Sequence, residues 1–110
     1  MGENKKVSEL YDLRVLFTSL LPMLFDKMIS DNKHPMIGAD GLKHMEGSLH
    51  FDGLAVDIIL SVSDEKILES TEDHRPYGEY WKSLHPYCRW GGDFRKSDGN
   101  HYSITFQGKA

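Results

Sequence analysis

The stretch Ser48-Leu49-His50-Phe51-Asp52-Gly53-Leu54-Ala55-Val56-Asp57-Ile58-Ile59-Leu60 decides the fold of this chain. From Leu54 onward it alternates, so that one face carries Leu54, Val56, Ile58 and Leu60 and the other carries Ala55, Asp57 and Ile59. This alternation predicts a β-strand with one face in the core. A half-buried carboxylate at Asp57, set among Ala and Ile, needs a partner, and a metal ion is one solution.

A second strand of the same design is expected near the other end of the sequence. His101 to Phe106 alternates, with Tyr102, Ile104 and Phe106 on one face and His101, Ser103 and Thr105 on the other. The segments 31–35, 38–53, 64–71 and 90–93 are rich in turn-forming or polar residues and predict turns, loops and short strands.

Two helices are expected beside these strands. The first, Val7 to Ile29, has an apolar stripe at three- and four-residue spacing, formed by Leu10, Leu13, Phe17, Leu20, Leu24 and Met28. Pro22 interrupts it and predicts a kink or two segments. The second helix begins around Glu72 to Pro76 and ends at Pro86. We therefore expect an α+β domain with helices packed on one face of a mainly antiparallel sheet.

Composition narrows the class of protein. The chain has 110 residues, which suits a single domain spanning 1–110, and 39% of them are hydrophobic. With 13 Lys and Arg against 17 Asp and Glu, the net charge is −4, which argues against nucleic-acid binding. The only cysteine, Cys88, cannot form an internal disulfide. The start of the sequence predicts neither a signal peptide nor a membrane anchor, so we expect synthesis in the cytoplasm.

His50, Asp57 and His101 form a candidate metal site. Two imidazoles and a carboxylate suit a catalytic Zn²⁺ that keeps its fourth position for water. His50 and Asp57 are seven residues apart, which would place them on opposite faces of one continuous strand. Gly53 permits a turn that brings His50 over the face of Asp57. The alternative is that the three residues have no common function, as a loop histidine, a half-exposed Asp and a surface histidine.

Motifs around these residues resemble a known family. Residues 48–57 match the signature Ser-x-His-x-x-Gly-x-Ala-x-Asp, 90–94 read Trp-Gly-Gly-Asp-Phe, and 98–102 read Asp-Gly-Asn-His-Tyr. Residues 74–81, His-Arg-Pro-Tyr-Gly-Glu-Tyr-Trp, are similar to a helix opening in small phage members. From Gly47 to Ser103 the chain thus resembles the zinc D-alanyl-D-alanine carboxypeptidases and the related phage L-alanyl-D-glutamate endopeptidases.

The resemblance implies roles for particular residues. It makes His50, Asp57 and His101 the zinc ligands and Asp98 the catalytic general base. Candidate substrate contacts are Ser48, Lys43 and Trp90. Members usually carry an upstream arginine that binds substrate, but residues 30–47 contain none. Lys43 is therefore the expected substitute, with Arg89 or Arg95 next in line.

Several residues keep two interpretations. Ser48 either orients a ligand or is a turn hydroxyl; Trp90 either lines a peptide groove or plugs the core. Asp93 either supports a ligand histidine or caps its loop. The remaining histidines, His34, His44, His74 and His85, are expected to be surface or structural residues. Cys88 is expected to be a packing or surface residue rather than a catalytic nucleophile.

Together these patterns predict a zinc-dependent peptidoglycan peptidase resembling a phage endolysin. It would act as a monomer on a bacterial stem peptide, and it would wait in the host cytoplasm until released to the cell wall in the periplasm. The expected scissile bond is L-alanyl-D-glutamate. The alternatives are a D-Ala-D-Ala carboxypeptidase or dipeptidase and a non-catalytic zinc-containing module that binds cell wall.

Overall fold

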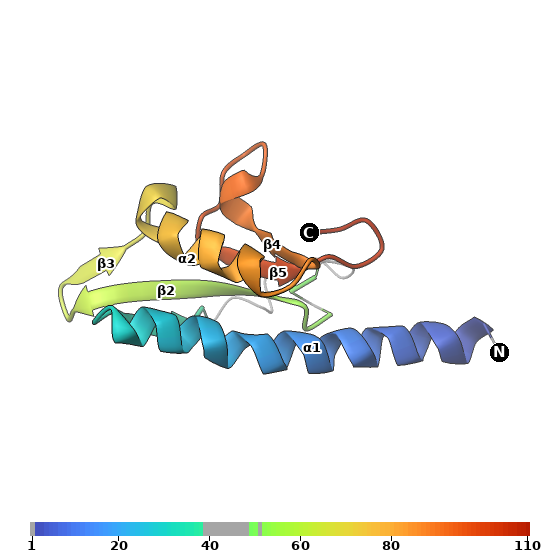
Figure 1. The fold of residues 1–110 in the computed structure, drawn as a ribbon. Coiled ribbons are helices and arrows are strands. Elements are labelled where there is room, and N and C mark those ends of the chain that lie inside the picture. Colours follow the sequence, from blue (N-terminus) through green and yellow to red (C-terminus); the bar gives the residue numbers. More distant parts are fainter. Residues whose placement is uncertain (1, 39–48, 51) are drawn as a thin grey trace.

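The computed structural model describes residues 2–38, 49–50 and 52–110. The expected α+β architecture is confirmed, with two α-helices and a mainly antiparallel sheet (Figure 1). In chain order the elements are α1 (Gly2–Ser30), β1 (His34–Ile37), β2 (Ala55–Ser63), β3 (Lys66–Leu68), α2 (Thr71–Leu84), β4 (Cys88–Trp90), the 3₁₀ helix η2 (Gly91–Asp93) and β5 (His101–Ile104).

The sheet is organised around the long strand β2. The strand order is β1-β2-β5-β4, and β3 also pairs with β2. β5 is antiparallel to β2 over residues 55–57, whereas β1 pairs with residues 58–61. The strand predicted at 54–60 is therefore confirmed and continues three residues further to Ser63.

Both helices contact the core face of the sheet. The Phe17 ring of α1 meets Trp81 of α2 edge-on, with 5.8 Å between ring centroids. Trp81 in turn meets Tyr102 of β5, at 6.4 Å between centroids. The predicted stripe on α1 is confirmed, because five of its six residues are buried: Leu13, Phe17, Leu20, Leu24 and Met28. In Figure 1, α1 runs along β2 and extends past the sheet at its amino-terminal end.

The first helix differs from its prediction in length and continuity. It begins at Gly2 and contains Pro22 within one unbroken element, so of the two expectations, a kinked helix or two segments, the second is wrong. Pro22 removes one backbone hydrogen bond. The helix continues because residues on both sides of it, such as Leu20 and Leu24, are buried against the same core.

Two short strands, β1 and β3, lie where the sequence predicts a turn or a polar connection. β1 begins at His34, inside the expected turn, and β3 lies in the expected polar connection. Most of their residues are exposed, so no alternation marks them as strands. Pairing with β2 gives them their extended conformation, and the fold of this region depends on β2.

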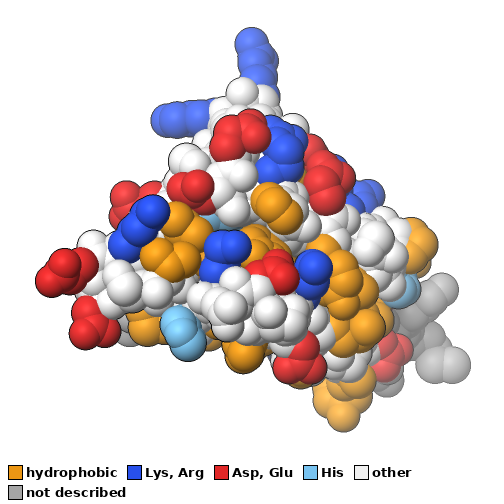
Figure 2. All heavy atoms as spheres, turned by 60° about the vertical axis from the view of Figure 1, so that its left-hand side comes forward, with side chains coloured by type: hydrophobic (Ala, Val, Ile, Leu, Met, Phe, Trp, Pro, Cys, Tyr) orange, Lys and Arg blue, Asp and Glu red, His pale blue; other side chains and the backbone are white. Residues whose placement is uncertain are grey.

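The face of the molecule seen in Figure 2 carries Lys and Arg side chains interspersed with Asp and Glu. Such mixing on this face agrees with the modest net charge of −4. Within the described part of the chain, no helix has the combination of length and apolar character that crossing a lipid bilayer requires.

Candidate metal centre

Asp57 and His101 lie opposite each other on neighbouring strands. They are partners in the register of β2 and β5, so both side chains project from the same face of the sheet. The next residues along, Ile58 and Tyr102, are completely buried on the opposite, helix-covered face. The pair therefore lies on the face of the sheet that the helices do not cover.

His50 reaches this face through a tight turn before β2. Gly53 has φ +76°, a conformation that glycine adopts without strain. The turn is closed by the Gly53 amide, which donates to the His50 carbonyl at 3.2 Å, and by the Leu54 amide, which donates to Leu49 at 2.8 Å. The predicted return of His50 over the Asp57 face is thereby confirmed.

Arg14 of α1 supports this turn, a role that the sequence analysis missed. Its Nε donates to the carbonyl of Asp52 at 2.7 Å. Arg14 and Asp52 are 38 residues apart, and neither belongs to a motif that would connect them. The contact arises from the packing of α1 along the sheet and has no local signal in the sequence.

The donor atoms of the three predicted ligands converge. His50 Nε2 lies 3.0 Å from His101 Nδ1 and 3.5 Å from Asp57 Oδ1, and His101 Nδ1 lies 3.8 Å from Asp57 Oδ1. All three side chains are largely buried, with exposed fractions of 7–13%. Two imidazole nitrogens and a carboxylate oxygen within 4.8 Å of one another could hold a metal ion. We call these three residues the metal cluster.

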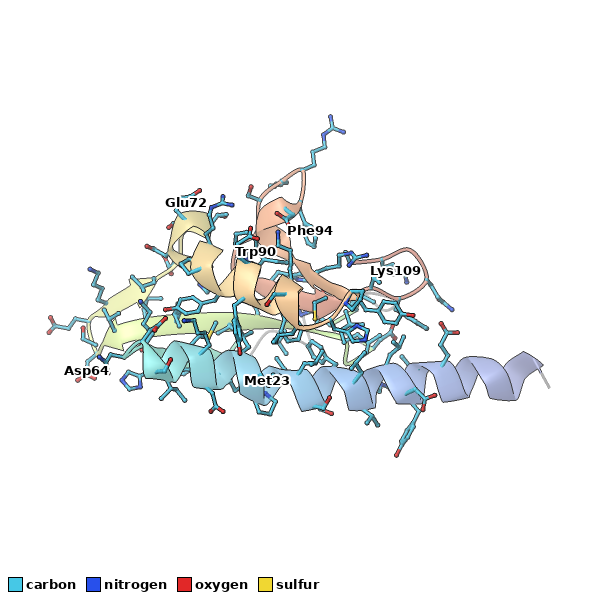
Figure 3. The ribbon with its side chains drawn as sticks, in the orientation of Figure 1. Met23, Asp64, Glu72, Trp90, Phe94 and Lys109 are labelled. Atoms are coloured by element: carbon cyan, nitrogen blue, oxygen red, sulfur yellow. The ribbon has the colours of Figure 1, made fainter. Side chains whose placement is uncertain are left out.

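His101 is held by the segment that precedes it. The Phe94 ring, from the loop after η2 (Figure 3), lies 5.1 Å from the His101 ring, centroid to centroid. The Gly91 carbonyl accepts from the Asp98 amide at 2.9 Å, and the Asp98 carbonyl accepts from the His101 amide at 3.1 Å. A Cβ at Gly91 would overlap the Asp98 backbone, so glycine is required for this close approach.

Asp98, the predicted general base, lies outside the metal cluster. Its side chain is exposed, and the described groups that could hold a metal ion do not include it. The hydrogen bond between the Asp98 carbonyl and the His101 amide fixes its backbone next to a ligand residue. The role of Asp98 as general base stays a prediction.

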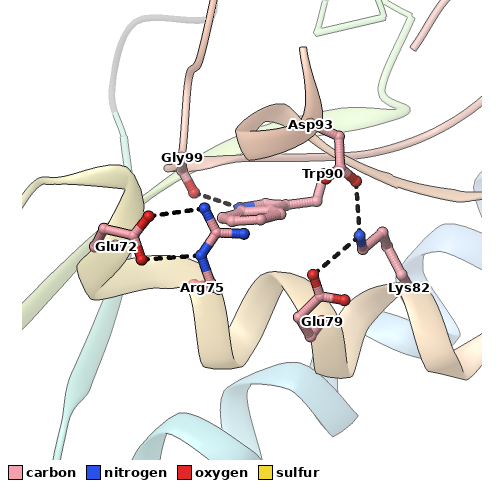
Figure 4. A network of polar contacts seen from close by, with 7 residues as sticks. All are labelled: Glu72, Arg75, Glu79, Lys82, Trp90, Asp93 and Gly99. Atoms are coloured by element: carbon pink, nitrogen blue, oxygen red, sulfur yellow. Dashed lines mark hydrogen bonds and ion pairs between the residues drawn. The ribbon is translucent and has the colours of Figure 1, made fainter.

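Trp90 is a core residue, so its predicted contact with substrate is wrong. Its side chain is 0% exposed, and its indole N–H donates to the Gly99 carbonyl at 2.7 Å. A Cβ at Gly78 or Gly92 would overlap the indole ring, so both glycines are required for its packing. Figure 4 shows the Arg75 guanidinium against the ring, with its carbon 5.3 Å from the centroid. The indole therefore contacts the protein on all sides.

The structure describes only some of the other residues that were predicted to support a ligand or contact the substrate. Asp93 was expected to support a ligand histidine or to cap its loop; the contact that its side chain makes is an ion pair with Lys82 at 2.8 Å (Figure 4). Ser48 and Lys43 lie outside the described residues. Of the two alternative arginines, Arg89 of β4 donates to the carbonyls of Pro86 and Cys88, and Arg95 is exposed.

His74 is a buried structural histidine, as predicted. Its side chain is 0% exposed, and Nε2 lies 3.0 Å from the Leu68 carbonyl, which can only accept. Nε2 therefore carries the proton, and Nδ1 accepts from the Tyr102 hydroxyl at 2.8 Å. Burial lowers the pKa of His74 and keeps the ring neutral.

The other histidines and the cysteine among the described residues have structural or surface positions. His85 accepts the Tyr87 amide at 3.0 Å, and His34 is exposed, whereas His44 lies outside the described residues. Burial raises the pKa of the Cys88 thiol to about 11, so it stays protonated at neutral pH. The prediction that Cys88 serves packing is confirmed by its 3% exposure.

Comparison with known proteins adds no relative. Neither protein-family models nor curated proteins nor solved structures gave a match to this chain, so the resemblance described above depends on its motifs alone.

Proposed function

We propose that this chain is a zinc-dependent peptidoglycan peptidase that cleaves the L-alanyl-D-glutamate bond of a stem peptide. The observation that carries the proposal is the convergence of His50, Asp57 and His101 on one sheet face. These are the residues that the motif resemblance assigns as zinc ligands, and residues 51 positions apart in sequence supply two of the donor atoms.

The donor set suits zinc. Three protein ligands with imidazole and carboxylate groups are typical of catalytic zinc sites, which keep one position open, whereas structural sites use four protein ligands. When bound, zinc polarises a scissile carbonyl and lowers the pKa of a water molecule towards about 7. Phe94 against His101 helps to fix the ring orientation that a ligand needs.

Asp98 has the chemistry of the general base. As an exposed carboxylate it can accept a proton from the attacking water and return it to the leaving amine. The hydrogen bonds from Asp98 to Gly91 and from His101 to Asp98 hold its backbone beside a ligand residue. General-base assistance of this kind accelerates hydrolysis by about 10²–10⁴-fold.

Digestion of purified muropeptides by the zinc-loaded protein, followed by mass spectrometry, tests the proposal. We expect the masses of products that result from cleavage between L-alanine and D-glutamate. His50→Ala should abolish both zinc content and cleavage, whereas the exposed His34→Ala should retain both and serves as the matched control. Release of terminal D-alanine would instead identify a carboxypeptidase. Zinc binding without any cleavage would identify a non-catalytic module, and either result would overturn the proposal.

A further inference from the structure

We propose that Arg14 of α1 is a positioning residue for the metal cluster, because it holds the turn that carries His50. Arg14 thereby sets the affinity of the cluster for a metal ion without contacting that ion. The inference rests on the metal centre of the proposed function and does not depend on cleavage of a peptide. The motifs that assign the ligands lie within residues 47–103, and Arg14 stands 38 residues before its partner Asp52.

The turn before β2 is anchored in the core at both ends. Leu49 and Leu54 are buried, at 3% and 0% exposure, and the Leu54 amide donates to the Leu49 carbonyl at 2.8 Å. Between them the chain reverses at Gly53, where the Gly53 amide donates to the His50 carbonyl at 3.2 Å. Burial of the two leucines fixes the ends of the turn, and the backbone contacts between them influence the orientation of His50.

Arg14 adds a contact to this turn from a distant element. Its Nε donates to the Asp52 carbonyl at 2.7 Å, which is short for a hydrogen bond between nitrogen and oxygen. The same side chain lies against Gly53, since a Cβ at that position would be 3.5 Å from Nε. A positively charged donor makes a stronger hydrogen bond than a neutral one. The helix therefore contacts the turn at two successive residues.

The first helix gives Arg14 a fixed base. Leu13 and Phe17, its neighbours on the helix, are buried at 9% and 2% exposure. Arg14 itself is exposed, and none of the ion pairs within residues 2–38, 49–50 and 52–110 includes it. Its polar partner in the structure is a backbone carbonyl next to a ligand-bearing segment. This arrangement suits a residue that positions the turn rather than one that forms a surface ion pair.

Positioning of this kind acts through the metal-free protein. A metal ion needs His50 Nε2 where the structure has it, 3.0 Å from His101 Nδ1 and 3.5 Å from Asp57 Oδ1. A turn that samples other conformations presents His50 for only part of the time, and the apparent affinity falls by that fraction. The free energy of one hydrogen bond limits the effect, so the dissociation constant should change about three- to tenfold.

Competition with a chromophoric chelator measures the zinc dissociation constant of variants at position 14. Arg14→Met keeps an unbranched stem but has no donor, so its dissociation constant should rise about three- to tenfold. Arg14→Gln is the rescue variant, because its amide nitrogen lies as many bonds from Cα as the Nε of arginine, and it should recover most of the loss. Lys27→Met removes a positive charge elsewhere on the same helix and should leave the constant unchanged.

The sign of the effect separates positioning from long-range charge. Loss of a positive charge near a bound cation should tighten metal binding, and it should do so equally in Arg14→Met and Arg14→Gln. Positioning predicts weaker binding in the first variant and recovery in the second. Parent affinity in Arg14→Met, or equal changes in the two variants, would overturn the proposal. A parent protein that binds no zinc would overturn it as well.

Two further measurements separate this role from folding and from catalysis. Because Arg14 is exposed, the metal-free Tm of Arg14→Met should lie within about 4 °C of the parent. A much larger fall would show that Arg14 stabilises the whole fold, which would overturn the positioning role. If the zinc-loaded parent cleaves no muropeptide, the peptidase function fails while the role of Arg14 stands, since zinc affinity is measured without cleavage.

Discussion

Replacing Trp90 with phenylalanine should lower the free energy of unfolding by about 3 kcal/mol. The substitution leaves the buried Gly99 carbonyl without its indole donor, which costs roughly 1–3 kcal/mol. The smaller ring also leaves a void between Gly78 and Gly92, which costs on the order of 1 kcal/mol or more. For a domain of this size the sum corresponds to a fall in Tm of roughly 12 °C.

Urea denaturation at constant m-value measures this effect, because a change in midpoint then reports stability alone. Tyr11→Phe is the control: Tyr11 is 66% exposed, and its substitution should change stability by less than about 0.5 kcal/mol. A Trp90→Phe protein as stable as the parent, with a raised KM for peptide, would refute the reasoning. That result would return Trp90 to the role of a substrate contact.

Three further predictions concern the site and its surroundings. Asp98→Asn should lower kcat by about 10²–10⁴-fold and retain zinc, whereas His101→Ala should lose zinc and activity together. Elemental analysis and kinetics measure both effects. Loss of zinc from the Asp98 variant would contradict the assignment. Chelation should lower Tm and added zinc should restore it, because a ligand bound only by the folded state stabilises that state; identical melting curves would argue against a metal at this cluster. Burial lowers the pKa of His74 below its ordinary 6.5, so at acidic pH the unfolded chain binds a proton that the folded chain does not. The contribution of neutral His74 to the free energy of unfolding is therefore fully present above pH 6.5. It declines as the pH falls below 6.5, by at most about 1.4 kcal/mol per pH unit. Urea titrations at several pH values should show a shallower decline in His74→Gln, and parallel declines would rule out His74 as the source.

The sequence predicts those elements whose pattern reflects burial. The alternation in β2 and the apolar stripe of α1 correspond to side chains that are almost completely buried, so both were predictable. β1 and β3 are three or four residues long, and most of their side chains are exposed. Their conformation comes from partners elsewhere in the chain, and no local pattern could reveal it.

The candidate site was predictable to a similar extent. Gly53 allowed the return of His50 to be foreseen, because a positive φ is a local property of glycine. The support of this turn by Arg14 depends on how distant segments pack. Trp90 shows the limit most clearly, since a tryptophan beside two glycines suits either a groove or a core.

The central position of β5 has a consequence for how the molecule opens. β5 follows the other strands in sequence, yet it lies between β2 and β4, and among the described strands it is the one that joins β4 to the rest of the sheet. Detaching β5 therefore separates β4 and removes His101 from Asp57 in the same event. Amide protons of β5 should exchange with solvent only through global unfolding, at rates shared by the facing residues of β2. A metal ion coordinated there would add its binding energy to that single cooperative unit rather than to a local loop.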